Sequence, residues 1–447
     1  MSRLCLVLLT VLTCGLSSAA ADWPQYLGPQ RNATSTETGL LRAWPAEGPK
    51  VLWRVALGEG FGAPAISDGK VYLLDRIGTE KDALRCFDLT DGKQLWSYEY
   101  DAPGKTSFAG SRAVPTIDEN FVFTCGPFGD VYCFDRNTQQ PVWHKNVWKD
   151  FGGEKAPTWA LAQNPLVYGD HLILAAQTGQ VGLVAYEKAT GEVAWTSPPL
   201  PGRLGYVSPT LVKIDGEEQL VMVTAGSSDR SGSGRSKSGR SKAGGSKSSG
   251  AKSDGSASGS PGAVVGLDPK SGRMLWSYEG WQCKIPVPNV TDIGDGRLLI
   301  AGGYRAGAAM IRIEKSGNSF RATEVFKTGE FGTHVHPAIL HEGHLYAQNS
   351  NNETRDGLVC MDLEGNVKWK TGREPTFDKG GMILADGMIL SADGSEMVYL
   401  IEPSPEGFKP LASAKLLETK LSWAPLALSD GKLLVRDQGQ MKCVAVR

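Results

Sequence analysis

Short apolar runs, bounded by residues that favour turns, recur along most of the chain. The clearest, "APAISDGKVYLLD" from Ala63, indicates a strand that begins at a proline, a turn at Asp-Gly and a second strand rich in apolar and β-branched residues. Further copies begin at His336 and Ala424, and looser copies begin at Val114, Asn164, Ser208, Val287 and Gly381. The chain therefore contains eight such pairs of predicted strands.

A second pattern follows most of these pairs and combines an acidic residue, a glycine and a tryptophan. "DLTDGKQLW", from Asp88 to Trp96, places the three at offsets of zero, four and eight. Copies with the same acid-to-tryptophan spacing span Asp268–Trp276, Glu187–Trp195 and Asp135–Trp143, the last with Gln139 in place of glycine, and Asp362–Trp369 is one residue shorter. Acid and glycine suit a tight turn, so the pattern predicts a third and a fourth strand joined by that turn.

Four antiparallel strands repeated about every 40 to 50 residues predict an all-β, eight-bladed β-propeller. The expected blades span 61–101, 108–147, 159–200, 203–280, 282–329, 333–373, 378–418 and 421–447. The last lacks a fourth strand, whereas "VLWRVAL" at 51–57 resembles the fourth strands of other blades. We expect this N-terminal strand to complete the last blade and to close the ring, so that residues 51–447 form one domain.

The tryptophans of the repeat are predicted to be structural, because each has enough area to span the gap to the neighbouring blade. They are Trp53, Trp96, Trp143, Trp195, Trp276 and Trp369. Phe326 is the expected substitute in blade five, and blade seven lacks a clear equivalent. These side chains are therefore not expected to contact a substrate.

The N-terminal residues predict export. Residues 1–21 combine Arg3, an apolar run and small residues, as a cleaved signal peptide does, and residues 22–50 form a lead-in to the propeller. A periplasmic or secreted location follows, with lipid anchoring through Cys14 as an alternative. Nothing else in the sequence predicts a membrane span.

Six cysteines remain after such cleavage, and export would permit disulfides. They are Cys86, Cys125, Cys133, Cys283, Cys360 and Cys443. Cys86, Cys133 and Cys360 each stand two residues before the acid of the repeat, which favours a small buried residue at one equivalent strand position. A bridge between Cys125 and Cys133 is left open.

The formal net charge of −1 argues against nucleic acid as the main partner. One segment departs from this neutrality: residues 227–261 carry seven Lys and Arg against Asp229 and Asp254, and contain no aromatic or branched apolar residue. Such a composition predicts a disordered loop that projects from blade four. The loop is either a basic tether for an anionic surface or a spacer without a function of its own.

At its acid, glycine and tryptophan turns the chain resembles the pyrroloquinoline quinone (PQQ) propeller repeat, found in quinoprotein alcohol dehydrogenases and in non-catalytic bacterial propellers. The resemblance begins at "DWPQYLGPQRNATS" from Asp22 and covers nearly all of the mature chain. Catalytic members carry adjacent cysteines, a tryptophan below the quinone and acidic residues around calcium. This sequence has no adjacent cysteines and no acidic cluster at its blade starts, so no catalytic, cofactor or metal residue is carried over.

The resemblance therefore implies a non-catalytic binding scaffold, expected to be a monomer, for protein or cell-envelope partners. A quinoprotein oxidoreductase with a divergent site, which would need PQQ and calcium, is the alternative.

The candidate binding site lies at the mouth of the central channel, beside the prolines that open the first strands. It comprises Arg112, Gln163, Asn164, Tyr206, Ser208, Lys284, His334, His336, Lys379 and Trp423. Together they predict a polar, mildly basic mouth for an anionic group or an acidic peptide segment. The competing interpretation is that unrelated polar residues border a water-filled channel.

His334 and His336 would point to the same side of a strand, as two ligands of zinc or copper do. Four of the six histidines fall in blade six, with His341 and His344 completing the group. No carboxylate or cysteine stands out as a third ligand. Solvated or hydrogen-bonded histidines are therefore the default, and a metal ion is the alternative.

Overall fold

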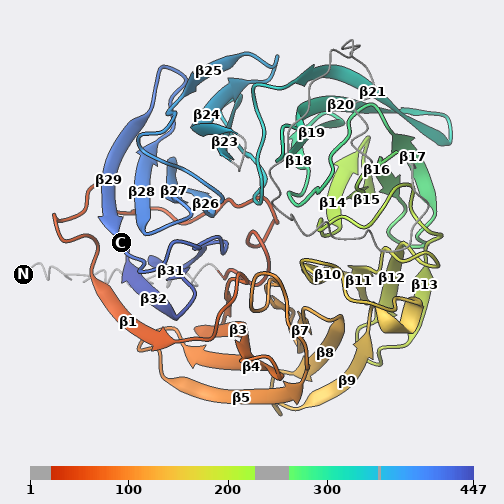
Figure 1. Ribbon diagram of the computed structural model, residues 1–447, viewed down its shortest axis with the longest axis horizontal. Coiled ribbons are helices and arrows are strands. Elements are labelled where there is room, and N and C mark those ends of the chain that lie inside the picture. The colour runs from red at the N-terminus through yellow and green to blue at the C-terminus, as the bar shows by residue number, and fades with distance from the viewer. Residues whose placement is uncertain (1–21, 227–260, 351–353) are drawn as a thin grey trace, which may run out of the picture.

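The computed structural model describes residues 22–226, 261–350 and 354–447. Within these ranges, thirty-two strands form eight four-stranded antiparallel sheets, arranged as blades around a central axis (Figure 1). The prediction of an eight-bladed propeller is confirmed. The predicted signal peptide, Cys14 and all of the predicted basic loop except Pro261 lie outside the described residues.

Each blade runs from an inner to an outer strand, and one 3-10 helix, η1 (Lys149–Phe151), follows β9. Blade one comprises β2 (Ala65–Ser67), β3 (Lys70–Ile77), β4 (Lys81–Asp88) and β5 (Gln94–Asp101); blade two β6 (Thr116–Ile117), β7 (Phe121–Cys125), β8 (Asp130–Asp135) and β9 (Pro141–Asn146); and blade three β10 (Leu166–Tyr168), β11 (His171–Ala175), β12 (Leu183–Glu187) and β13 (Val193–Thr196). Blade four comprises β14 (Thr210–Ile214), β15 (Glu217–Val223), β16 (Val264–Leu267) and β17 (Met274–Tyr278); blade five β18 (Thr291–Gly294), β19 (Arg297–Gly302), β20 (Gly307–Ser316) and β21 (Ser319–Thr328); and blade six β22 (Ile339–His341), β23 (His344–Ser350), β24 (Arg355–Asp362) and β25 (Val367–Lys370). Blade seven comprises β26 (Met382–Ala385), β27 (Met388–Ala392), β28 (Met397–Glu402) and β29 (Lys409–Lys415), and blade eight comprises β30 (Ala427–Ser429), β31 (Lys432–Arg436) and β32 (Gln440–Ala445) with β1 (Val51–Ala56).

The ring closes through its two ends, as predicted. The N-terminal strand β1 pairs antiparallel with the C-terminal strand β32, with Trp53 opposite Cys443 and Ala56 opposite Gln440. Arg436 of blade eight also donates to the carbonyl oxygens of Gly58 at 2.9 Å and Gly62 at 3.2 Å, which lead into blade one. Closure leaves no blade without a neighbour on either side.

A small residue lies directly opposite the repeat tryptophan on the third strand. The pairs are Cys86 with Trp96, Cys133 with Trp143, Ala185 with Trp195, Gly266 with Trp276, Cys360 with Trp369 and Cys443 with Trp53. A register shift adjoins each pair, as in a β-bulge, which bends a strand and re-aims its side chains. The recurring cysteines therefore leave room for an indole ring.

Three indole rings also explain the glycine of the repeat, because each of them lies over the turn of the next blade. A Cβ atom would come within 2.7 Å of the Trp53 ring at Gly92, 2.7 Å of the Trp143 ring at Gly191 and 2.6 Å of the Trp195 ring at Gly272. These glycines also have positive φ, which costs other residues free energy. Turn geometry and inter-blade packing therefore both favour glycine.

Hydrogen bonds from the indoles join neighbouring blades as well. Trp53 Nε1 donates to the carbonyl oxygen of Leu89 at 2.9 Å, and Trp369 Nε1 donates to that of Ser404 at 2.8 Å. Trp276 differs, since its Nε1 donates to Gln219 Oε1 in its own blade at 2.6 Å.

Blade five uses phenylalanine in the tryptophan position, as expected. Phe326 lies opposite Met310, and a Cβ atom at Gly365 of blade six would come within 2.9 Å of its ring. In blade seven the equivalent position is Ala412, opposite Leu400. Blade seven therefore lacks a large side chain at this position.

Each of the six cysteines among the described residues is buried and free. Cys125 and Cys133 are not cross-strand partners, because Cys125 pairs with Val131 and Cys133 pairs with Phe123. The bridge left open between them is therefore not formed, and these thiols pack as small apolar groups.

The first part of the lead-in, residues 23–35, lies along the inner strands in the central channel (Figure 1). Its Trp23 exchanges two backbone hydrogen bonds with Ile66 of β2, at 2.8 and 2.9 Å. Further on, Ala33 and Ser35 bond to the backbone of Leu384 in β26, and the chain then passes outward between blades seven and eight to β1. Sequence patterns did not predict this course.

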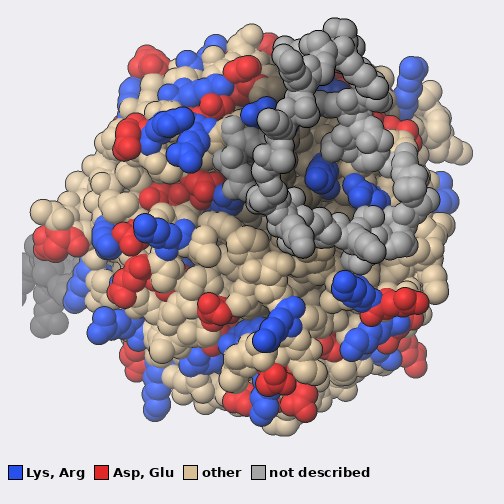
Figure 2. All heavy atoms as spheres, in the orientation of Figure 1, with Lys and Arg blue, Asp and Glu red and all other residues tan. Residues whose placement is uncertain are grey.

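Charged residues of both signs are interspersed around the outer part of the face seen in Figure 2, with no continuous field of one sign among the described atoms. No helix among the described residues is long and apolar enough to cross a bilayer.

Candidate functional site

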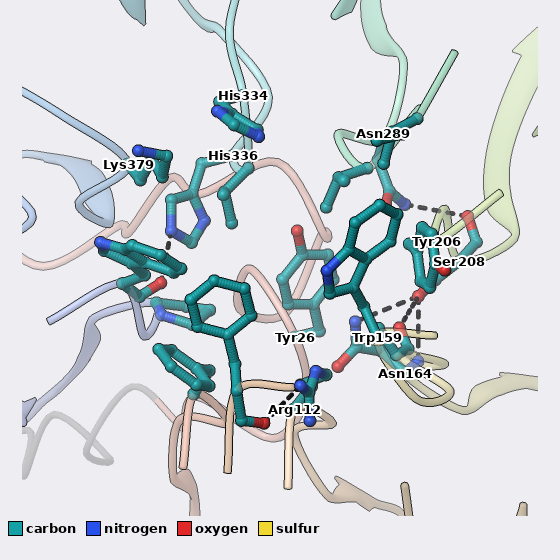
Figure 3. A pocket seen from close by; sticks show the side chains of 18 of the residues that line it. Tyr26, Arg112, Trp159, Asn164, Tyr206, Ser208, Asn289, His334, His336 and Lys379 are labelled. Carbon is teal, nitrogen blue, oxygen red and sulfur yellow. Dashed lines mark hydrogen bonds between the residues drawn. The ribbon is translucent and has the colours of Figure 1, made fainter. Parts of the chain in front are cut away.

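A cavity of about 500 Å³ lies at the mouth of the channel (Figure 3). Side chains from segments near the inner strands of all eight blades line it, and Tyr26 of the lead-in lies between its walls. The lead-in also contacts the turns after the first strands, at Asp68, Asp386 and Gly431, which belong to the opposite end of the channel. The cavity is therefore a cup with the lead-in beneath it, and we call it the axial cup.

Most of the predicted mouth residues meet in the axial cup. They are Arg112, Asn164, Tyr206, Ser208, His334, His336, Lys379 and Trp423. Gln163 and Lys284 are not among the lining residues. Gln163 is buried between blades three and four, where its Nε2 donates to the carbonyl oxygen of Val207 at 3.2 Å, and Lys284 is exposed.

Sequence reasoning missed several lining residues: Tyr26, Phe61, Phe108, Trp159, Asn289, Tyr304 and Asp378. A signal for three of them was available, because Phe61, Phe108 and Trp159 are the first residues of the predicted blades one to three. For Tyr26 no such signal existed, since the lead-in belongs to no repeat.

Three of the polar lining residues join blades to one another. Asn164 Oδ1 accepts from the backbone N–H of Val114 at 2.8 Å, and its own N–H donates to Ser208 Oγ at 2.9 Å. Asn289 Nδ2 in turn donates to the Ser208 carbonyl oxygen at 3.2 Å and to Thr210 Oγ1 at 2.7 Å. This ladder connects the inner strands of blades two to five, so these side chains shape the cup while stabilising the ring.

Aromatic rings form the wall where blades one, two and eight meet. Phe61 stacks on Trp423 with ring centroids 5.2 Å apart, and Phe108 lies 5.3 Å from Trp423. On the far side Trp159 meets Tyr206 edge to face at 5.7 Å. Such surfaces favour planar and apolar groups.

Two cations lie against these rings. The Arg112 guanidinium lies 5.8 Å from the Phe61 centroid, and Lys379 Nζ lies 4.9 Å from that of Trp423. Lys379 Nζ also donates to both carboxylate oxygens of Asp378 at 2.8 Å. The cup thus combines aromatic faces with positive charge.

His334 and His336 are buried and uncharged near neutral pH. Burial lowers the pKa of His336 to about 4, and burial together with the nearby Lys379 lowers that of His334 to about 4. His336 Nε2 donates to the carbonyl oxygen of Trp423 at 2.9 Å, since a carbonyl can only accept. Within the described ranges no group of three or more His, Cys, Asp or Glu side chains could hold a metal ion, so a histidine metal centre has no third ligand here.

The backbone is strained at two lining residues. Lys379 has φ of 66° and Tyr304 has φ of 55°, in the left-handed region that disfavours residues with a Cβ atom. Such strain concentrates at binding and catalytic sites, where the surrounding structure imposes it.

The cup does not fit a quinone held by calcium. Calcium takes about six to eight oxygen ligands, mostly carboxylates, carbonyls and water. Among the described residues that line the cup, only Asp378 carries a carboxylate, and Lys379 binds both of its oxygens.

Comparisons with known proteins identify relatives named as assembly factors and relatives named as quinoprotein dehydrogenases. A family model described as outer membrane protein assembly factor BamB matches residues 25–113 and 84–371. The BamB protein of Shewanella oneidensis is 30% identical over 162 residues, which are 36% of this chain and 39% of that protein. The quinoprotein alcohol dehydrogenase PedH of Pseudomonas putida is 26% identical over 151 residues, 32% of this chain and 24% of that protein. These matches span about two fifths or less of the relatives' own lengths.

Solved structures share the fold at low sequence identity. The quinohemoprotein alcohol dehydrogenase of Comamonas testosteroni superposes with a TM-score of 0.63 at 14% identity, over 95% of this chain and 80% of that one. BamB of Moraxella catarrhalis gives a TM-score of 0.57 at 12% identity, over 89% and 97%. At these identities the likeness concerns the fold alone.

Proposed function

The chain belongs to the family described as outer membrane protein assembly factor BamB, and from this premise we propose that it is an exported, non-catalytic scaffold of the cell envelope whose axial cup binds a segment of a partner protein. The relatives named BamB support protein partners and a cell-envelope location. The predicted signal peptide is consistent with both.

One observation carries the proposal: the cup has an aromatic wall that continues onto an exposed rim. Phe108 is 37% exposed and Leu421 is 40% exposed, and both border the same cavity. Large apolar side chains in a concave site mark a place where another molecule binds. The described lining residues also offer no nucleophile paired with a base and no free carboxylate, which favours binding over chemistry.

A photo-crosslinking amino acid placed at position 421 tests this function in the organism that carries the protein. Leu421 is exposed at the rim, so its replacement should leave the fold intact. We expect irradiation to join the chain to one discrete partner. Val193 on β13, 50% exposed on the outside of the ring, is the matched control position and should give no such adduct.

Equal adducts from positions 421 and 193 would indicate nonspecific capture and would contradict the proposal. A second variant carries the crosslinking amino acid at position 108, the other exposed rim residue. The absence of any adduct from both the 421 and the 108 variant would contradict the proposal as well.

A further inference from the structure

Arg112 is a largely buried cation without an acidic partner among the described residues. Its Nη1 and Nη2 donate to the carbonyl oxygens of Gly110 and Phe108, both at 2.6 Å, and no carboxylate forms an ion pair with it. Burial lowers its pKa to about 10, so it remains charged at neutral pH. Carbonyl dipoles compensate such a charge only in part, so a carboxylate from outside would be bound favourably.

A second cation of the same kind lies at the base of the cup. Arg31, from the lead-in, is buried and donates to the carbonyl oxygens of Pro165 at 3.0 Å and of Asn164 at 3.5 Å. Its guanidinium lies 5.9 Å from the centroid of the Tyr26 ring, which borders the cup. Since Asp378 offsets only Lys379, the cup and its base carry net positive charge.

The aromatic wall and the exposed rim restrict what the occupant can be. Phe61, Trp423 and Trp159 border this one cavity, so a planar side chain that enters it meets aromatic surface. A small anion confined to the cavity would leave Phe108 and Leu421 in water. A polypeptide that continues over the rim would cover both, which favours a peptide over a free small molecule.

We propose that the axial cup binds a short extended peptide segment in which an aromatic side chain stands next to Asp or Glu. The aromatic side chain enters the cup, and the neighbouring carboxylate pairs with Arg112. This inference rests on the proposed function and specifies the chemistry of the partner's segment.

Three synthetic peptides with blocked termini test the need for the carboxylate and for the aromatic ring separately. They are Gly-Asp-Phe-Asp-Phe-Gly, Gly-Asn-Phe-Asn-Phe-Gly, which lacks the carboxylates, and Gly-Asp-Ala-Asp-Ala-Gly, which lacks the rings. Titration calorimetry with the mature chain should give an affinity at least about tenfold higher for the first than for either other peptide, because one charge-assisted pair or one buried ring contributes about 1.4 kcal/mol or more. Arg112→Gln should remove most of the advantage of the first peptide over the second. Arg273→Gln, an exposed arginine far from the cup at the turn of blade four, is the matched control and should bind like the unaltered chain.

Equal affinities for the first two peptides, or an unchanged affinity in a folded Arg112→Gln variant, would overturn the inference. If Arg112→Gln does not fold, the salt dependence decides: the affinity of the first peptide should fall with sodium chloride while that of the second stays constant, and parallel behaviour would overturn the inference. Saturable binding of PQQ with calcium but of none of the peptides would overturn it too. A specific adduct at position 421 combined with no peptide binding would reject only this inference, whereas no adduct would reject the proposed function itself.

Discussion

At the scale of single residues, packing of an indole ring on a glycine recurs at three interfaces between neighbouring blades, those of Trp53, Trp143 and Trp195. The ring of one blade lies on the turn of the next, and a small residue opposite the tryptophan makes space for it. Each of these positions therefore has a requirement that can be tested by one substitution.

Gly92→Ala should destabilise the protein more than Gly69→Ala. Both glycines have positive φ, 73° and 68°, so both substitutions add the same backbone strain of about 1–2 kcal/mol. Only at Gly92 would the new methyl group meet the Trp53 ring, whereas nothing lies within 4 Å at Gly69. We expect a further loss of about 1–3 kcal/mol at Gly92, measured by denaturant unfolding. Equal losses would show that the ring contact contributes nothing.

Lys379→Gly should be more stable than Lys379→Ala. Both variants lack the ammonium group, but glycine adopts the φ of 66° without strain, which is worth about 1 kcal/mol. Denaturant midpoints of the two variants give the comparison. An alanine variant as stable as the glycine variant would contradict backbone strain at this position.

His336 should make the protein less stable as the pH falls from 6.5 towards 4. Its pKa is about 4 in the folded protein and near 6.5 when unfolded, so the unfolded chain binds the extra proton in this window. The slope contributed is up to about 1.4 kcal/mol per pH unit. Buried Asp82, whose pKa burial raises to about 6, contributes in the opposite direction, so the comparison must be between variants.

His336→Gln keeps a donor for the Trp423 carbonyl oxygen and removes the titration. The difference in unfolding free energy between the two proteins should change with pH between 6.5 and 4 and should be constant from 7 to 8. A constant difference throughout would refute a buried neutral His336.

At the scale of elements, the lead-in is the part of the fold that converts an open channel into a cup. It is held by main-chain hydrogen bonds to β2 and β26, at 2.8–2.9 Å. It also brings Tyr26 and Arg31, two groups that no blade supplies.

Hydrogen exchange should show residues 22–36 as protected as β3, which pairs with the inner strand of blade one. Amides in stable pairing exchange only on sub-global opening, whereas an unattached N-terminal segment exchanges within seconds to minutes. Peptide-level mass spectrometry of 22–36, with the β3 segment as a reference, makes the measurement. Rapid exchange of 22–36 beside a slow β3 would contradict a lead-in fixed in the channel.

The repeats explain how much could be predicted from sequence. Alternating apolar positions and fixed turn spacing encode each blade locally, so strand order, ring closure and the role of Phe326 followed from equivalent positions. The same equivalence placed Arg112, Lys379 and Trp423 at the channel mouth. It could not place Tyr26, because the lead-in has no equivalent elsewhere. It also did not predict that Asn164 lines the cup whereas Gln163 does not, a difference that arises because neighbouring residues of an extended segment point in opposite directions.

At the scale of the whole molecule, closure makes the eight blades one cooperative unit. Arg436→Met removes the bonds from blade eight to the Gly58 and Gly62 carbonyl oxygens and should cost about 1–3 kcal/mol in a single unfolding transition. Arg54→Met, at an exposed position on β1, is the control and should change stability little. Two separate transitions, or equal effects of the two substitutions, would contradict this account of closure.

The most direct test of the binding account is the identity of the peptide that is joined to position 421 after photo-crosslinking. Mass spectrometry of the digested adduct should recover a partner segment in which Phe, Tyr or Trp neighbours Asp or Glu, because the cup offers aromatic walls and Arg112, which has no carboxylate partner among the described residues. Recovery of a basic or uniformly polar segment, or of a non-peptide adduct, would contradict the account.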